Sequence, residues 1–121
     1  MAYICANPES YDGKKVGSGQ CVEFVKEAAN APQTSLWKEG VKVKGASTVQ
    51  KGTAIATFVD GKYPNKSTGN HAAIFVIQDT GGLWVYDQWV AQGMVKKRYL
   101  KFKGGVDSSL SNDGDAFSVI D

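Results

Sequence analysis

A helical pattern of apolar positions stands near the start of the chain. Between positions 22 and 29, apolar residues recur three and four positions apart, and charged side chains fill the remaining places. This spacing predicts an amphipathic helix of about three turns. Ser18 or Gly19 is expected to cap the helix, and Asn30 and Pro32 are expected to end it.

The second half of the chain has the pattern of short strands separated by turn residues. The expected strands are 53–59, 71–77, 83–90, 94–102 and 116–120. Segment 71–77 is apolar on both faces after its first residue, which is typical of a central strand. Residues 1–19 and 33–51 are expected to be loops, with one helical turn near 35–39. The sequence therefore predicts an α+β fold, in which the early helix packs on an antiparallel sheet of four to six strands.

Composition places the chain among ordinary globular domains. It has 121 residues, of which 42% are hydrophobic and 21% charged, so we expect one domain over 1–121. The net charge of +2 is too small to favour a nucleic-acid partner, and the basic stretch 96–103 is expected to be the solvent-facing side of a strand. No apolar run approaches the roughly 20 residues of a membrane span. The first ten residues lack the pattern of a signal peptide, which predicts a protein that is cytoplasmic when synthesised.

The candidate chemistry rests on very few residues. The chain has two cysteines, Cys5 and Cys21, and a single histidine, His71. This set is too small for a zinc site, and we expect neither a metal nor a cofactor. A Cys5–Cys21 disulfide stays open for an oxidising compartment. Cys21 falls in the first turn of the expected helix, where backbone N–H groups and the helix dipole favour the thiolate, and His71 is the one imidazole that could take its proton.

A third group is expected to orient the imidazole. In two registers of the hairpin between 71–77 and 83–90, Asp87 lies on the same face as His71. A register shifted by one residue would present Gln88 instead. We prefer Asp87 because a carboxylate stabilises an imidazolium, whereas an amide only orients the ring. A plain surface position for Asp87 stays open.

Three blocks in this order resemble a known superfamily. They are 19–25 (GQCVEFV), 69–75 (GNHAAIF) and 85–89 (VYDQW). Together they resemble the papain-like NlpC/CHAP superfamily of bacterial cysteine peptidases and amidases, and the similarity extends over 17–90. With the block 111–117 (SNDGDAF), the chain is most similar to a small bacterial family within that superfamily.

The resemblance implies hydrolysis of an amide bond, typically in the stem peptides of peptidoglycan. Cys21 would attack the carbonyl carbon, His71 would carry the proton, and Asp87 would hold the ring. Backbone N–H groups at the helix start would bind the oxyanion. Gln20 could add a donor or simply cap the helix, and Tyr11 could donate a hydroxyl from the preceding loop.

The places of the tryptophans, of Gln88 and of the acidic segment 112–115 are predicted from their positions in the expected elements. Gln88 and Trp89 are further candidates for contacts with substrate, although Trp89 could equally belong to the core. Trp84 points to the opposite face of the strand and is expected in the core, and Trp37 is a candidate for the cleft wall. The segment 112–115 is expected to be a turn, because it lacks the spacing of a calcium loop.

The expected biological setting combines this activity with the missing signal peptide and the small size of the chain. The chain would act as a secreted antibacterial effector or as a lysis protein, exported by a contact-dependent or other non-classical route. Its partners would be a peptidoglycan peptide and, where one exists, an inhibitor or immunity protein. Two alternatives stay open: a non-catalytic binding module on the same fold, and a Cys–His acyltransferase or deamidase.

Overall fold

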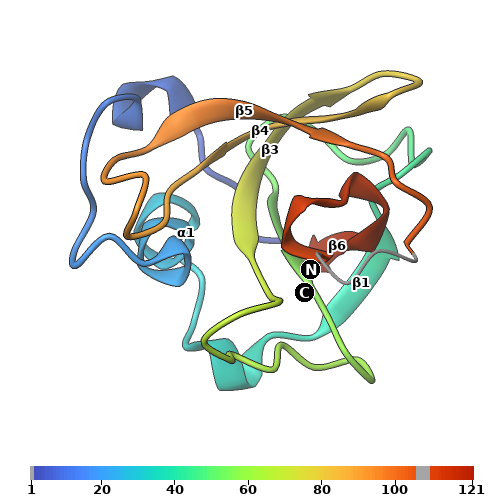
Figure 1. Cartoon of the computed structure of the whole chain (residues 1–121), viewed down its shortest axis with the longest axis horizontal. Helices are drawn as coiled ribbons and strands as arrows, with labels where there is room; N and C mark the ends of the chain where they lie inside the picture. The colour runs from blue at the N-terminus through green and yellow to red at the C-terminus, as the bar shows by residue number, and fades with distance from the viewer. Residues whose placement is uncertain (1, 106–109) are drawn as a thin grey trace.

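The fold is one α-helix packed on a six-stranded antiparallel sheet (Figure 1). It is a computed structural model that describes residues 2–105 and 110–121. The elements are α1 (Cys21–Ala29), β1 (Glu39–Lys42), β2 (Ala54–Thr57), β3 (Ala72–Gln78), β4 (Gly82–Asp87), β5 (Lys96–Lys101) and β6 (Phe117–Ile120). Four short 3-10 helices are η1 (Pro8–Tyr11), η2 (Thr34–Leu36), η3 (Leu110–Asn112) and η4 (Gly114–Ala116). The strand order is β1-β6-β2-β3-β4-β5, which confirms the predicted α+β class.

The sequence missed one strand. β1 lies in the segment 33–51, which was expected to be a loop, and it pairs with β6 at the edge of the sheet. Most of its residues are exposed, so the alternation that marks a half-buried strand is missing there. The loop expected over 1–19 contains the single turn η1, and Met1 lies outside the described residues.

Both faces of the sheet are covered, which explains the doubly apolar pattern of β3. On one face, α1 packs on β3 and β4 with Phe24 and Val25 fully buried against Ile74. On the other face, side chains from β2 through β6 meet in a second cluster, so the sheet curls around them. β3 therefore runs through the middle of the protein (Figure 1), as its sequence predicts, although its far end at Ile77 is exposed.

The N-terminus of α1 is held by a carboxylate. The cap is Gln20 rather than Ser18 or Gly19, because Gly19 is in a left-handed conformation with φ of 97°. The Glu23 carboxylate reaches back and accepts hydrogen bonds from the backbone N–H groups of Gln20 and Ser18 and from the Ser18 hydroxyl. This is the acidic half of a capping box, and it fixes the point at which the helix begins. Asn30 ends α1 in the left-handed conformation, as expected.

The β3–β4 hairpin carries a bulge that decides which side chains meet. At the turn, Gln78 pairs with Leu83, but beyond the bulge Phe75 pairs with Val85. The register near the site is therefore one of the two that were expected to bring Asp87 to the face of His71. The prediction that Trp84 lies in the core is wrong: its side chain is 36% exposed and packs on the outer surface against Tyr99. No helix among residues 2–105 and 110–121 is long and apolar enough to cross a membrane.

Candidate active site

Cys21 is the first residue of α1, so its sulfur lies at the end of the helix where backbone N–H groups have no helical partner. The side chain is partly buried and interacts with His71 and with the backbone of Ala72, the first residue of β3. Cys21 and Cys5 are both free thiols. The helix start therefore presents a reduced sulfur directly to the chain's imidazole.

His71 is fixed by a carboxylate on the neighbouring strand. Its Nε2 lies 2.7 Å from Oδ2 of Asp87, whose side chain is 0% exposed. Because Nε2 faces the carboxylate, Nδ1 is the ring nitrogen left for Cys21. His71 precedes β3 and Asp87 ends β4, so the two adjacent strands bring these side chains together at one end of the sheet.

Arg98 is a site residue that the sequence did not predict. Its Nε lies 3.0 Å from both oxygens of Asp87, and its Nη2 lies 2.6 Å from Oδ2. The guanidinium also stacks over the ring of Trp89 at 4.4 Å. The basic stretch was expected to be the solvent-facing side of a strand, which is wrong at Arg98. The β4–β5 register could have indicated it, because Arg98 pairs with Val85 and so shares the face of Asp87.

Gln88 has a structural role: it is buried and binds the backbone before α1 instead of facing substrate. Its side chain is fully buried, and its Oε1 accepts from the Val16 N–H at 3.1 Å. Its Nε2 donates to the carbonyls of Val16 and Gln20, each at 2.9 Å. These bonds tie the segment before α1 to the end of β4. Gln88 therefore helps to set the position of Cys21.

A different tyrosine takes the place expected for Tyr11. The ring of Tyr11 packs edge-on against Phe24 at 5.4 Å, and the structure does not bring its hydroxyl to Cys21. Instead, the hydroxyl of Tyr63 lies 3.8 Å from the Cys21 sulfur. Tyr63 also accepts a hydrogen bond from Asn70 Nδ2 at 3.2 Å, which leaves its own hydrogen for the sulfur. The loop position of Tyr63, distant in sequence from Cys21, gave no local signal of this contact.

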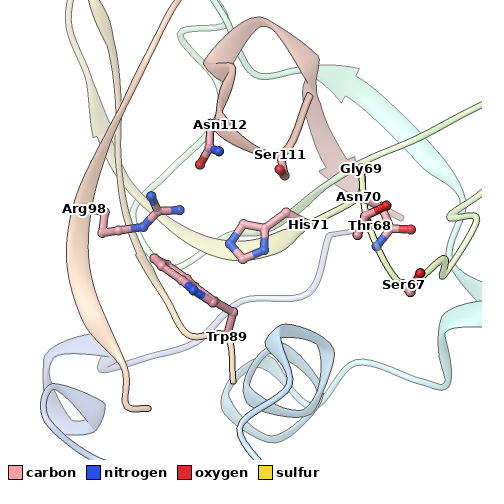
Figure 2. Close-up of a pocket in the computed structure, with 9 residues that line it drawn as sticks. All are labelled: Ser67, Thr68, Gly69, Asn70, His71, Trp89, Arg98, Ser111 and Asn112. Carbon is pink, nitrogen blue, oxygen red and sulfur yellow. The ribbon is translucent and has the colours of Figure 1, made fainter. Parts of the chain in front are cut away.

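A cavity of about 320 Å³ opens on the His71 side (Figure 2). Trp89 and Arg98 line one side of it, and Ser111 and Asn112 lie across from them. Trp89 is therefore at the cavity, edge-on to His71 with ring centroids 6.2 Å apart.

Two further predicted site residues lie away from this cavity. Gln20, a candidate oxyanion donor, is exposed next to Cys21 in the chain. Trp37, a candidate for the cleft wall, is buried against Tyr63.

The charged forms of Cys21, His71 and Asp87 stabilise one another. Burial alone would raise the pKa of Cys21, but the hydrogen bond and positive charge of His71 outweigh it, so the pKa is lowered. Burial alone would lower the pKa of His71, but the bonds to Asp87 and Cys21 raise it to about 9. Burial would raise the pKa of Asp87, and His71 and Arg98 lower it instead. Near neutral pH the arrangement therefore favours a thiolate beside an imidazolium.

The acidic cluster near the C-terminus has a structural role. Asp113 is fully buried, and its carboxylate accepts from the backbone N–H groups of Lys103, Gly105 and Asp115. Asp113 thus joins the short 3-10 helices η3 and η4, where the sequence predicts a turn. Within residues 2–105 and 110–121, no group of three or more His, Cys, Asp or Glu side chains could hold a metal ion.

Comparison with known proteins identifies the family of the chain. Residues 1–120 match the family model of domesticated amidase effector 2. The chain belongs to this family. The resemblance to the papain-like NlpC/CHAP superfamily, and the expectation of an amidase, are thereby confirmed.

Individual relatives cover nearly the whole chain. The type VI secretion amidase effector 2 protein of Salmonella typhi is 42% identical, over 100% of both chains. Domesticated amidase effector 2 of Ixodes scapularis is 36% identical, over 97% of this chain and 83% of its own length. A solved structure of type 6 secretion amidase effector 2 (Tae2) superposes with a TM-score of 0.88 at 42% identity, and covers 98% of this chain and 94% of that one.

Proposed function

We propose that this protein is a cysteine amidase whose single domain, residues 1–121, hydrolyses an amide bond in the stem peptides of bacterial peptidoglycan. The observation that carries the proposal is that Cys21 interacts with His71, whose Nε2 lies 2.7 Å from the buried carboxylate of Asp87. The relatives that cover the chain are named as amidase effectors.

The proposed reaction proceeds in two steps. The Cys21 thiolate attacks the carbonyl carbon, and the C–N bond breaks as His71 gives a proton to the leaving amine. Water then attacks the thioester with His71 as base, which releases the acid and restores the thiol. Backbone N–H groups at the start of α1 stabilise the oxyanion, because they lie beside the sulfur without helical partners. Asp87 stabilises the imidazolium throughout.

Mass spectrometry of digested cell walls tests the activity. The reduced protein is incubated with purified peptidoglycan, and new stem-peptide fragments are expected with the wild type but not with Cys21→Ala. The loss in rate for Cys21→Ala is expected to reach at least about 10⁴-fold. If the folded, reduced wild type produces no fragment, the proposal is wrong. Fragments carrying the acyl group on an amine would instead indicate the acyltransferase alternative.

A labelling experiment separates an enzyme from a binding module. A thiol-reactive probe near neutral pH should modify Cys21 faster than Cys5, whose pKa is raised chiefly by burial. His71→Ala should remove this preference, because it removes the positive charge beside the sulfur. Equal, slow labelling of both cysteines in the wild type would favour the binding module.

The proposed setting is that of an antibacterial effector exported by contact-dependent secretion, with an immunity protein in the producing cell. The name of the Salmonella typhi relative supports it. Expression directed to the periplasm should lyse the bacterial host, because the peptidoglycan lies there, whereas cytoplasmic expression should not. The Cys21→Ala variant directed to the periplasm is the control. Equal toxicity of wild type and variant would contradict the proposal.

A further inference from the structure

A second polar cavity adjoins the one beside His71. It has a volume of about 260 Å³, runs along β5, and shares Arg98 and Asn112 with the first cavity. Lys101 and Lys103 line its far part. The two cavities therefore form a neighbouring pair that leads from His71 toward the C-terminal end of β5.

The pair of cavities presents positive charge. Their lining includes Arg98, Lys101 and Lys103, and no carboxylate from the described residues lines either one. Asp87, which neutralises Arg98, is 0% exposed, whereas the Arg98 side chain is 24% exposed. The negative charge of Asp87 is thus buried beneath the cavity wall, and the positive charge of Arg98 lies at the surface of the cavity.

Arg98 is already held in place for a ligand. Asp87 uses Nε and Nη2, and Trp89 supports the face of the guanidinium. Nη1 has no hydrogen-bond partner among residues 2–105 and 110–121. Figure 2 shows the guanidinium directed into the space between His71, Asn112 and Trp89. Because little side-chain freedom remains to be lost, an anion can bind here at low entropic cost.

We propose that this pair of cavities binds a free carboxylate of the substrate peptide, on the leaving-amine side of the bond that is cut. His71 must lie beside the leaving amine in order to protonate it, and His71 lines the first cavity. The group that enters this cavity is therefore part of the amine fragment. A free carboxylate is the anion that a peptide fragment carries close to its amine. This inference rests on the proposed function.

The test compares two versions of one substrate. The muropeptide that the cell-wall digest shows to be cut is prepared with its leaving-side carboxylates free or converted to carboxamides. The wild type should cut the free acid with a kcat/KM about tenfold higher, mainly through KM. Arg98→Gln should bring this ratio close to one, and the double variant Lys101→Gln/Lys103→Gln should lower it to about threefold. Because each enzyme is compared with itself, any effect of Arg98 on the chemical step cancels.

A matched control stays on the same strand. Lys96→Gln/Lys97→Gln removes two exposed β5 charges that line neither cavity, so the tenfold ratio should remain. A ratio near one in the wild type would overturn the proposal, and so would an unchanged ratio in Arg98→Gln. If Arg98→Gln does not fold, the lysine double variant decides: a reduced ratio supports the site, and an unchanged ratio overturns it.

Failure of the proposed function gives a different result. If the cell-wall digest yields no fragment, the amidase proposal is wrong, and the carboxylate site is then judged by calorimetric binding of a synthetic stem peptide, with its carboxylates free or converted to carboxamides, to Cys21→Ala. Tighter binding of the free acid supports the site. Equal binding, or no binding of either peptide, overturns it.

Discussion

The imidazole side of the site and the sulfur side differ in how their side chains are fixed. On the imidazole side, His71, Asp87 and Arg98 come from or adjoin three neighbouring strands and are joined by charged hydrogen bonds of 2.7 and 2.6 Å. On the sulfur side, Cys21 stands at a helix start, and its contact with Tyr63 is a longer one of 3.8 Å. The sheet therefore fixes the base firmly, whereas the position of the nucleophile depends on how the start of the helix is held.

Two consecutive residues make this difference concrete. Asp87 and Gln88 are both fully buried, but their side chains have different partners. Asp87 meets two cationic groups, which a carboxylate stabilises best. Gln88 meets a backbone N–H and two carbonyls, so it must accept and donate at the same time, which an amide can do and a carboxylate cannot. Asp87 therefore stabilises the charge of His71, and Gln88 positions the start of the helix that carries Cys21.

The largest effect should come from Asp87→Asn, which keeps the shape of the side chain and removes its charge. We expect kcat/KM to fall by about 10³–10⁴-fold. The pKa of His71, which Asp87 and Cys21 raise to about 9, should also fall well below that value. Since His71 is the only histidine, its NMR signal reports this directly. A loss in kcat/KM of less than tenfold would contradict the role proposed for Asp87.

The dependence of the hydrolysis rate on pH tests the protonation states of His71 and Cys21. The folded-state pKa of His71 is raised to about 9, so the imidazolium persists below that pH and is lost above it. The rate of amide hydrolysis should therefore fall by about tenfold per pH unit above pH 9, as the proton for the leaving amine is lost. On the acid side, activity should extend below the ordinary thiol pKa, because the pKa of Cys21 is lowered. A profile that keeps rising above pH 9 would contradict the imidazolium.

Arg98→Gln should act through charge on the imidazole side. We expect kcat to fall by about tenfold or more and the free energy of unfolding to fall by about 2 kcal/mol, because the buried Asp87 loses one of its two cationic partners. Arg98→Lys keeps the charge but loses the two-pronged contact, so it should recover only part of the rate. Full activity of Arg98→Gln would show that His71 alone holds Asp87. Chemical denaturation and steady-state kinetics provide the two readouts.

Gln88→Ala should act through position on the sulfur side. It leaves the Val16 N–H and the carbonyls of Val16 and Gln20 without their partner, so we expect a loss of about 2–3 kcal/mol in unfolding free energy. Labelling of Cys21 should slow, while the His71 titration stays near 9. Gln33→Ala, at an exposed glutamine, is the control and should change stability by less than about 0.5 kcal/mol. A lowered His71 midpoint in Gln88→Ala would show that the two sides are not separable in this way.

Tyr63→Phe should have the smallest effect. The hydroxyl donates to the sulfur, so its removal makes the thiolate less stable and should slow labelling of Cys21 near neutral pH by about threefold. Asn70→Ala should act in the same direction, because Asn70 orients the Tyr63 hydroxyl. Tyr11→Phe is the matched control and should leave the labelling rate unchanged. An equal effect of Tyr11→Phe and Tyr63→Phe would contradict the assignment of Tyr63.

Local pattern was enough to determine the helix that begins with the nucleophile, the central strand that begins beside His71, and the α+β class. These features rest on periodicity within about ten residues, which the printed sequence carries directly. The same pattern could not predict β1, whose exposed residues form a strand only because β6 lies beside them. It also placed Trp84 in the core, because an aromatic side chain has the same local pattern on either face of a sheet.

Contacts between distant segments decided the rest. Arg98 reaches Asp87 through the β4–β5 register, Tyr63 reaches Cys21 from a loop, and Gln88 holds the chain seventy-two residues before it. The choice of Asp87 over Gln88 depended on the bulge between Phe75 and Ile77, which shifts the register by one residue. A shift of one residue turns every side chain of a strand to the other face, and the packing of two buried clusters, rather than any local motif, sets it.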